Sequence, residues 1–324
     1  YNALVKTDLC PMKKTFKHFV IGIVGGAVLV SLLFGHFDRS VDELKPIYAG
    51  GTSDFVEIIG MEVHYRDEGN PLDSVPVVLI HGTGSSLHTF DAWTADLKED
   101  RRVVRMDLPG FGLTGPFPDR NYSMEQYVDF VAEFLAARGI QRCILGGNSL
   151  GGQVAWNFTL EHPDRVAKLI LIDAAGYPLK STSVPLAFRI ARTPVLKNIL
   201  TFITPRFVVA SSVANVYADK SKVTEALIDR YFDLSLRSGN RQALVDRMQM
   251  PFDSSMVEQI KTIDQPTLIL WGAQDGLIPL ESAYRFQKDL PNDTLVVLKN
   301  SGHVPMEEDP EESLAGVLGF IANK

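Results

Sequence analysis

The feature that most constrains the fold of this chain is a series of continuous apolar segments of strand length. We expect six strands in these segments, which read VPVVLIHG, RRVVRMDLPG, QRCILGGNS, VAKLILIDAAG, PTLILWGAQD and DTLVVLKNSGH. A segment without polar alternation is typical of a strand that is buried on both faces of a parallel sheet. Two further strands are expected before them, in DFVEIIGMEVHYRDEG, with a turn at Gly60.

Amphipathic stretches of helical length separate these segments. They read TFDAWTADL, SMEQYVDFVAEFLAARG, GGQVAWNFTLEHP, ESAYRFQKDL and PEESLAGVLGFIAN. Ser123 and Gln126 have the spacing of a capping box at the start of the second helix, and Gly139 is placed to end it. Strands that alternate with helices predict the α/β class, with a mostly parallel eight-stranded sheet and helices on both of its faces.

One region interrupts the alternation. Residues 178–261 contain no strong strand pattern, only helical amphipathic pieces broken by Pro185, Pro194, Pro205 and Pro251. A segment of this length is too long for a loop, so we expect a separate helical cap. The core is then made of residues 46–177 and 262–324.

The N-terminal residues 1–45 differ in composition from the rest. Lys13, Lys14 and Lys17 precede an uncharged run at 19–35, and no pattern of small residues that would direct cleavage follows it. The run has the length of a short transmembrane helix. We therefore expect an uncleaved signal-anchor, in preference to a cleaved signal peptide, with the membrane as partner through this one helix. The lysines would keep the N-terminus inside, so the catalytic domain would face the periplasm or the exterior.

Charge and cysteine content exclude several classes of partner. The 39 acidic residues exceed the 32 lysines and arginines, for a formal net charge of −7, so we expect no nucleic-acid partner. Cys10 and Cys143 are not expected to pair, because one lies in the tail and the other in a buried strand. No metal-ligand spacing and no dinucleotide fingerprint is present, so we expect no metal and no cofactor.

Side chains capable of acyl-transfer chemistry follow the predicted strands. Ser149 lies in Gly147-Asn148-Ser149-Leu150-Gly151, Asp173 and Asp275 follow the next two strands, and His303 follows the last. The carboxyl ends of parallel strands meet at one edge of a sheet, so these groups should gather there in the chain order serine, acid, histidine.

With these motifs the sequence resembles the α/β-hydrolase family from about Phe55 to the C-terminus. The resemblance implies Ser149 as nucleophile on a strained turn, His303 as general base and Asp275 as the acid that orients it. Asp173 is the alternative acid, at a site that some members use. The backbone N–H groups of Leu150 and Thr83 would form the oxyanion hole.

Other polar residues of these motifs have ordinary structural interpretations. His81 is expected to brace the oxyanion loop, and Asp107 to accept hydrogen bonds from backbone amides in its turn. His88, Trp93 and His162 are expected in surface or core roles.

The resemblance predicts a serine hydrolase that forms an acyl-enzyme. A serine at position 149 disfavours the dehalogenase and epoxide-hydrolase branches, which attack through a carboxylate. The apolar cap favours a carboxylesterase or lipase-like activity on small-molecule esters with apolar acyl chains. We expect Gly82, Asn148, Phe188 and Val304 to contact this substrate.

Two alternatives remain open. A carbon–carbon bond hydrolase of the meta-cleavage-product type shares the Gly-Asn-Ser-x-Gly-Gly form, and Arg189 or Arg192 could bind its substrate's carboxylate. A non-catalytic binding protein on this fold is disfavoured, because such proteins typically lose the serine or the histidine. The sequence leaves the oligomeric state open.

Overall fold

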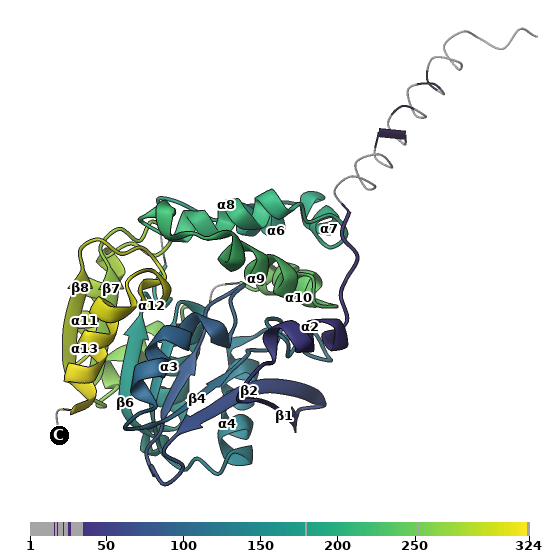
Figure 1. Ribbon diagram of the computed structural model, residues 1–324. Coiled ribbons are helices and arrows are strands. Elements are labelled where there is room, and N and C mark those ends of the chain that lie inside the picture. Colours follow the sequence, from purple (N-terminus) through teal and green to yellow (C-terminus); the bar gives the residue numbers. More distant parts are fainter. Residues whose placement is uncertain are drawn as a thin grey trace, which may run out of the picture.

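The computed structural model describes residues 16, 18, 22, 25, 26, 35–178, 180–251 and 253–322, and an eight-stranded sheet lies at the centre of the described chain (Figure 1). The strands, in spatial order across the sheet, are β1 (Ser53–Ile58), β2 (Met61–Gly69), β4 (Arg102–Met106), β3 (Val77–Ile80), β5 (Cys143–Asn148), β6 (Val166–Ile172), β7 (Thr267–Gly272) and β8 (Asp293–Leu298).

Most neighbouring strands run parallel. Only the β1–β2 and β2–β4 pairs are antiparallel, and the β1–β2 hairpin turns at Gly60 with a φ of 72°. The other five pairs of the described sheet are parallel, so the carboxyl ends of β3 to β8 meet at one edge. The predicted fold class is confirmed.

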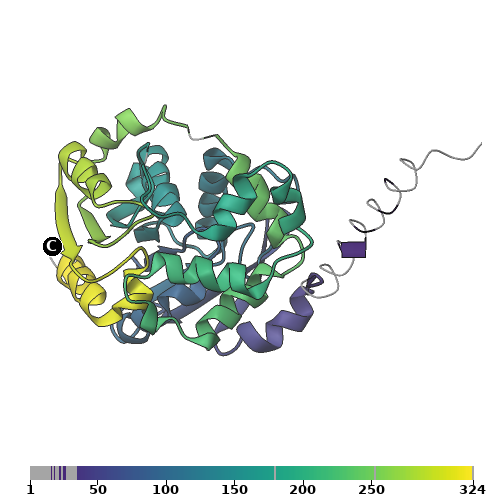
Figure 2. The same cartoon turned by 90° about the horizontal axis from the view of Figure 1, so that it is seen from above.

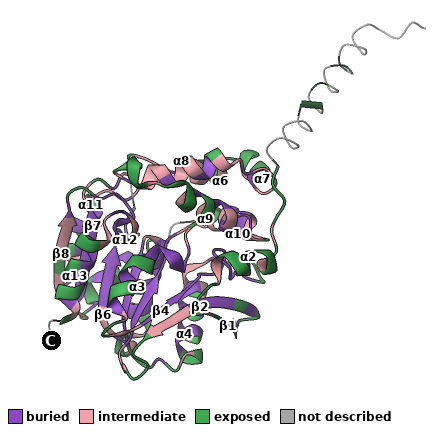
Figure 3. Ribbon diagram, viewed as in Figure 1, coloured by how far each residue is buried: buried purple, intermediate pink, exposed green. Residues whose placement is uncertain are grey.

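Helices cover both faces of the sheet (Figures 1 and 3). On one face lie α4 (Met124–Ala137), α5 (Leu150–Glu161) and α11 (Glu281–Asp289), and on the other lie α3 (Asp91–Leu97) and α13 (Pro310–Ala322). Helix α4 begins as expected, because the Gln126 backbone N–H donates to Ser123 Oγ, 3.2 Å away.

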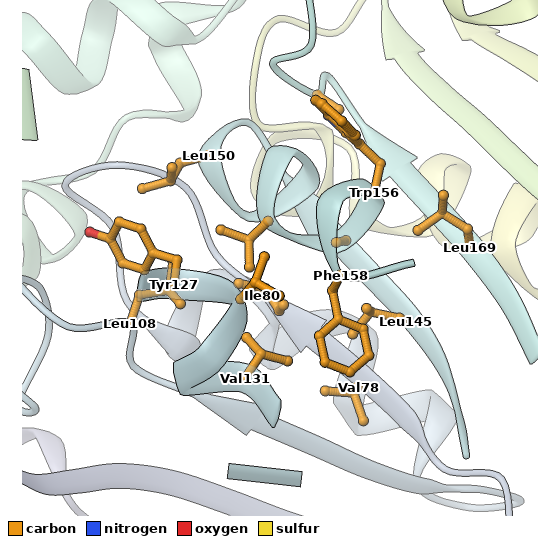
Figure 4. Close-up of a cluster of buried hydrophobic side chains, with 14 of the residues drawn as sticks. Val78, Ile80, Leu108, Tyr127, Val131, Leu145, Leu150, Trp156, Phe158 and Leu169 are labelled. Carbon is orange, nitrogen blue, oxygen red and sulfur yellow. The ribbon is translucent and has the colours of Figure 1, made fainter. Parts of the chain in front are cut away.

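Large apolar side chains fill the layer between α4, α5 and the sheet. Phe158 of α5 lies by Val78 and Leu145 of the sheet, and Trp156 lies on the side of Leu169 (Figure 4). Burial of each such side chain stabilises the fold by about 1.5–3 kcal/mol. This layer fixes α5 on β5, and the Ser149 turn lies between them.

Five α-helices of the described chain lie between β6 and β7 in sequence. They are α6 (Leu186–Arg192), α7 (Leu196–Leu200), α8 (Arg206–Val216), α9 (Glu225–Ser235) and α10 (Asn240–Gln249). They cover the edge where the carboxyl ends of the parallel strands meet (Figures 1 and 2). We use the name cap for residues 178–261; that these boundaries delimit a separate domain stays a prediction.

The expectation that the N-terminal segment anchors the protein in a membrane is wrong. In the part of the chain described here, no helix combines the length and the apolar composition that a bilayer crossing needs. Most of the run at 19–35 lies outside the described residues. The first complete helix that the structure describes is α2 (Val41–Tyr48), whose Leu44 is buried against Leu113 and Leu234.

Candidate active site

Ser149 lies on a sharp turn between β5 and α5. Its backbone has a φ of 55° and a ψ of −114°, in a region that non-glycine residues rarely adopt. A Cβ on Gly147 would lie 2.2 Å from the Gly151 carbonyl carbon, and one on Gly151 would lie 2.1 Å from the Ile80 oxygen. The flanking glycines therefore allow the backbone segments to approach closely enough for the turn to form.

His303 and Asp275 contact each other at the same edge of the sheet. His303 Nδ1 lies 2.6 Å from Asp275 Oδ2, and both residues are buried. The backbone N–H groups of Leu277 and Ile278 donate to the other carboxylate oxygen, at 2.8 and 3.0 Å. Asp275 is thus held in place on both oxygens, and it contacts the imidazole of His303 through Nδ1, not through Nε2.

Asp173, the alternative acid, lies beside this pair but does not bond to the histidine. Its Oδ1 accepts a hydrogen bond from the Gly272 N–H at 3.0 Å, while its buried Oδ2 has no such donor. Burial, and next the negative charge of Asp275, raise the pKa of the Asp173 carboxyl well above its usual range. The neutral form of Asp173 is favoured beside an ionised Asp275.

These three residues form the one metal-compatible group that the described residues contain. Single ligand atoms of Asp173, Asp275 and His303 all lie within 4.8 Å of one another. A neutral carboxyl is a poor cation ligand, and His303 Nδ1 is already engaged by Asp275. The arrangement fits a hydrogen-bonded group better than a metal centre.

The two expected oxyanion donors lie next to Ser149. Leu150 is the first residue of α5, and Thr83 follows β3 in the loop that packs on the serine turn. A Cβ on Gly82 of that loop would lie 3.1 Å from the Ser149 Cβ. Among the hydrogen bonds of the described residues, none uses the Thr83 or Leu150 N–H, so both are available to a ligand.

His81 holds the oxyanion loop in position. Its Nδ1 donates to the Gly82 oxygen at 2.8 Å, and its Nε2 accepts from the Leu108 N–H at 2.9 Å. These partners fix one neutral tautomer, and burial lowers the pKa of the ring. His81 is therefore a brace, as its place in the sequence predicts.

Ser149 and His303 line one cavity beneath the cap, with a volume of about 720 Å³ including the part that is open to solvent. Its walls consist of Gly82, Thr83, Gly84, Ser85, Asn148, Ser149, Pro185, Ala187, Phe188, Val209, Ser212, Val213, Val216, Tyr231, Ser235, Leu244, Leu277, His303 and Val304. All four residues expected to contact the substrate are among them. None of these described wall residues is Asp, Glu, Lys or Arg.

The cap arginines considered for carboxylate binding lie elsewhere. Arg189 and Arg192 of α6 are exposed, and neither lines this cavity. The structure therefore does not bring them together with Ser149 and His303.

Glu308 is a residue of the site that the sequence does not reveal. It is 3% exposed, and its carboxylate accepts from the Gly302 N–H at 2.7 Å and from the Asp219 N–H at 2.6 Å. A third donor is the Ala218 N–H at 3.2 Å. In addition, the His303 N–H donates to the Val216 oxygen at 2.8 Å, so the histidine loop is bonded to the end of α8.

A second polar group missed from the sequence surrounds Glu307. Its carboxylate accepts from the hydroxyls of Tyr217 and Tyr231, at 2.7 and 3.2 Å, and pairs with Arg230 at 2.5 Å. Tyr231 OH also lies 3.2 Å from Ser85 Oγ on the cavity wall. The contacts of Tyr217 and Tyr231 gave no signal in the sequence, because they join segments about 75 residues or more apart.

Asp107 has the structural role expected of it, with one partner that the sequence does not reveal. It accepts from the backbone N–H groups of Leu87 and Leu113, at 2.7 and 2.8 Å, and contacts His64 Nδ1 at 2.7 Å. Burial alone would raise the pKa of Asp107, but His64 holds it well below its usual range. His88 and Trp93 are buried in the core and do not line the cavity.

Comparison with known proteins identifies this architecture. Residues 75–310 match a family model described as the alpha/beta hydrolase fold. The 2-hydroxy-6-oxo-2,4-heptadienoate hydrolase of Pseudomonas putida is 30% identical over 273 residues, which cover 81% of this chain and 94% of that protein. The hydrolase YugF of Bacillus subtilis is 28% identical, over 81% of this chain and 95% of its own.

Solved structures share the fold along nearly their whole length. A structure named as a membrane phospholipase A superposes with a TM-score of 0.68 at 26% identity, covering 95% of this chain and 98% of its own. The meta-cleavage product hydrolase of Pseudomonas fluorescens superposes with a TM-score of 0.70 at 25% identity, over 84% of this chain and 97% of its own.

Proposed function

The chain belongs to the α/β-hydrolase family, and from that premise we propose that it is a serine hydrolase of carboxylic esters with apolar acyl chains. The observation that carries the proposal is the cavity shared by Ser149 and His303. Apart from small and hydroxyl-bearing residues its walls are largely aliphatic and aromatic, with Phe188, Val209 and Val213 contributed by the cap. Such walls suit an apolar acyl or alkyl chain.

The proposed reaction follows from the groups around Ser149. Ser149 Oγ attacks the ester carbonyl carbon and passes its proton to His303 Nε2, while Asp275 stabilises the resulting imidazolium. The Thr83 and Leu150 N–H groups donate to the oxyanion. The carbon–oxygen bond to the alcohol breaks, and the alcohol leaves with the proton from His303. Water, deprotonated by His303, then releases the carboxylic acid and restores Ser149.

The acid assignment in this proposal rests on geometry. Asp275 Oδ2 is 2.6 Å from His303 Nδ1, whereas Asp173 bonds to a backbone N–H on β7. The acid that contacts Nδ1 is the one placed to orient the ring and to stabilise an imidazolium, and that acid is Asp275. The name of one structural neighbour, a phospholipase A, agrees with action on an ester.

The second candidate is carbon–carbon bond hydrolysis of a meta-cleavage product. Some proteins similar to this chain are named as hydrolases of such compounds, and this favours the second candidate. One of them is 30% identical to this chain. The cavity gives it less support, because its described walls carry no cation for the substrate's carboxylate and because Arg189 and Arg192 are exposed. We therefore place it second.

A chain-length series separates the two. The purified protein should hydrolyse p-nitrophenyl esters from acetate to laurate with an optimum length, and Ser149→Ala should abolish both turnover and labelling by a fluorophosphonate probe. Thermal unfolding of Ser149→Ala serves as the folding control. Turnover of a vinylogous 1,5-diketone acid together with inactivity on every ester would replace the proposal by the second candidate.

A further inference from the structure

A second cavity adjoins the one that contains Ser149 and His303. Its volume is about 500 Å³, and it shares wall residues with the first, including Ser85, Ala187 and Leu244. The walls that belong to the second cavity alone include apolar residues such as Phe111 and Leu200, and also Asn240 and Arg241, the first two residues of α10. A substrate whose ester group lies at Ser149 and whose acyl or alkyl chain enters the second cavity would therefore meet polar side chains there.

Asn240 presents a hydrogen-bond acceptor without a partner. The residue is 4% exposed, and its Nδ2 donates to the oxygens of Gly112 and Leu234, at 3.0 and 2.9 Å. Two carbonyl partners fix which end of the amide is nitrogen. Its Oδ1 is buried and has no donor among the described residues. An unpaired buried acceptor is unfavourable unless a ligand or water satisfies it.

Arg241, the next residue along α10, has a donor without a partner. The residue is 6% exposed, and its Nε and Nη2 donate to Asp38 Oδ1, at 3.0 and 2.6 Å. Its Nη1 is buried and has no acceptor within the described chain. The charge of Arg241 is balanced by Asp38, so the unused N–H is a donor rather than an uncompensated cation.

We propose that the second cavity is a subsite for a hydroxyl group on the ester substrate. The hydroxyl oxygen accepts from Arg241 Nη1–H, and its proton is donated to Asn240 Oδ1. Only a group that both accepts and donates satisfies the two free atoms at once. A carboxylate would face the Asn240 oxygen and the negative charge of Asp38, and a methyl group would leave both atoms unpaired. The inference rests on the proposed ester hydrolysis and specifies its substrate class.

Matched ester pairs test the subsite. We would measure kcat/KM for p-nitrophenyl alkanoates from butanoate to dodecanoate against their ω-hydroxy counterparts, and for alkyl acetates against ω-hydroxyalkyl acetates. In the wild type, kcat/KM should be higher for the hydroxy member of the pair at one or more chain lengths. The expected factor is roughly three- to tenfold, which corresponds to the net free energy of a typical hydrogen bond. The ratio within a pair is independent of any general loss of activity.

Two variants locate the effect. Arg241→Lys should bring the hydroxy-to-methyl ratio down towards one, because the single nitrogen of a lysine that pairs with Asp38 cannot also occupy the position of Arg241 Nη1. Arg189→Lys, on the exposed surface of α6, is the matched control and should keep the wild-type ratio. If Arg241→Lys fails to fold, Asp38→Asn provides a second test: it leaves the arginine charge uncompensated, and ω-carboxy esters should gain several-fold over ω-hydroxy esters.

The outcomes are distinct. Hydrolysis of the unsubstituted esters without a hydroxy preference in either series, a preference that survives Arg241→Lys, or a wild-type preference for ω-carboxy esters would each overturn the subsite alone. Inactivity on every ester would overturn the proposed function and the subsite with it.

Discussion

Asp173 and Asp275 show how environment divides the roles of two neighbouring carboxyl groups. Asp275 accepts hydrogen bonds from two backbone N–H groups through one oxygen and contacts His303 through the other. Asp173 has one backbone donor and lies beside another carboxylate, and its pKa is raised chiefly by burial. A neutral Asp173 can stand next to Asp275 without repelling it.

Replacement of each acid by its amide should separate these roles. Asp275→Asn should lower kcat by on the order of 10³- to 10⁴-fold, because the amide favours the wrong histidine tautomer. Asp173→Asn should change kcat by less than about tenfold, since it replaces one neutral hydrogen-bonding group by another. Steady-state kinetics on one p-nitrophenyl ester would measure both, with thermal unfolding as the folding control. An equal loss in the two variants would contradict the assignment.

A glycine comparison tests how tightly the serine turn is packed. Gly151→Ala should lower the free energy of unfolding by about 3 kcal/mol or more, because the new Cβ would lie 2.1 Å from the Ile80 backbone oxygen. Gly319→Ala is the matched control in helix α13, where a Cβ meets no atom within 4 Å. It should raise stability by about 0.5–1 kcal/mol. Urea unfolding measures both, and equal effects would mean that the turn can relax.

Sequence reasoning succeeded for residues whose role is set by a local motif. The glycines around Ser149, the His81 loop and the Asp107 turn are each recognisable from a few neighbouring residues. Glu308, Arg241 and Asn240 have roles that depend on partners in other segments, such as Gly302 and Asp219 for Glu308. Charged and amide side chains are usually exposed. No local sequence pattern shows that folding buries one of them and leaves one of its atoms without a hydrogen-bond partner.

Helix α12 (Pro305–Glu308) connects the cap to the histidine loop. Glu308 accepts hydrogen bonds from both, through Gly302 on one side and Ala218 and Asp219 on the other. The His303–Val216 backbone bond joins the same two segments. A displacement of the end of α8 would therefore be transmitted to the backbone of His303.

Removal of one carboxylate oxygen should loosen this connection. In Glu308→Gln the amide nitrogen cannot accept from a backbone N–H, so at least one charge-assisted hydrogen bond is lost, for about 2 kcal/mol of stability. Hydrogen exchange at residues 216–219 and 301–303 should become faster, and kcat should fall. Glu312→Gln, at an exposed position at the start of α13, is the control. Unchanged exchange in Glu308→Gln would show that the cap is held by other contacts.

At the scale of the whole molecule, the sheet was predictable and the surroundings of the site were less so. Continuous apolar segments of strand length that alternate with amphipathic segments of helical length are typical of a parallel sheet, and all eight expected strands are present in the described chain. The cap arginines could not be placed, because an amphipathic helix fixes which residues share a face but not which face meets the cavity. The membrane anchor was inferred from composition alone, and the described helices do not support it.

The core as a whole should be sensitive to acid, through a histidine that it holds in the neutral form. Burial lowers the pKa of His88 to about 4 from the usual 6.5. His88 Nε2 lies 2.9 Å from the Tyr48 oxygen and 3.3 Å from Arg66 Nη2, and Nδ1 lies 3.0 Å from Ser86 Oγ, so a positive charge on the ring would face the charge of Arg66. Between pH 6.5 and 4 the unfolded chain binds a proton at this position and the folded chain does not. Stability therefore falls as the pH falls through that window.

His88→Gln should reduce this dependence, because glutamine can still donate to the Tyr48 oxygen and has no proton to gain. The free energy of unfolding, measured by urea titration at several pH values between 7 and 4, should fall less steeply in the variant than in the wild type.

Asp173 acts in the opposite direction, since its raised pKa makes the folded chain bind a proton that the unfolded chain releases. Because Asp173 is present in both proteins, the difference between their curves isolates His88. Parallel curves for the wild type and His88→Gln would show that the His88 ring takes up a proton in the folded protein as readily as in the unfolded chain.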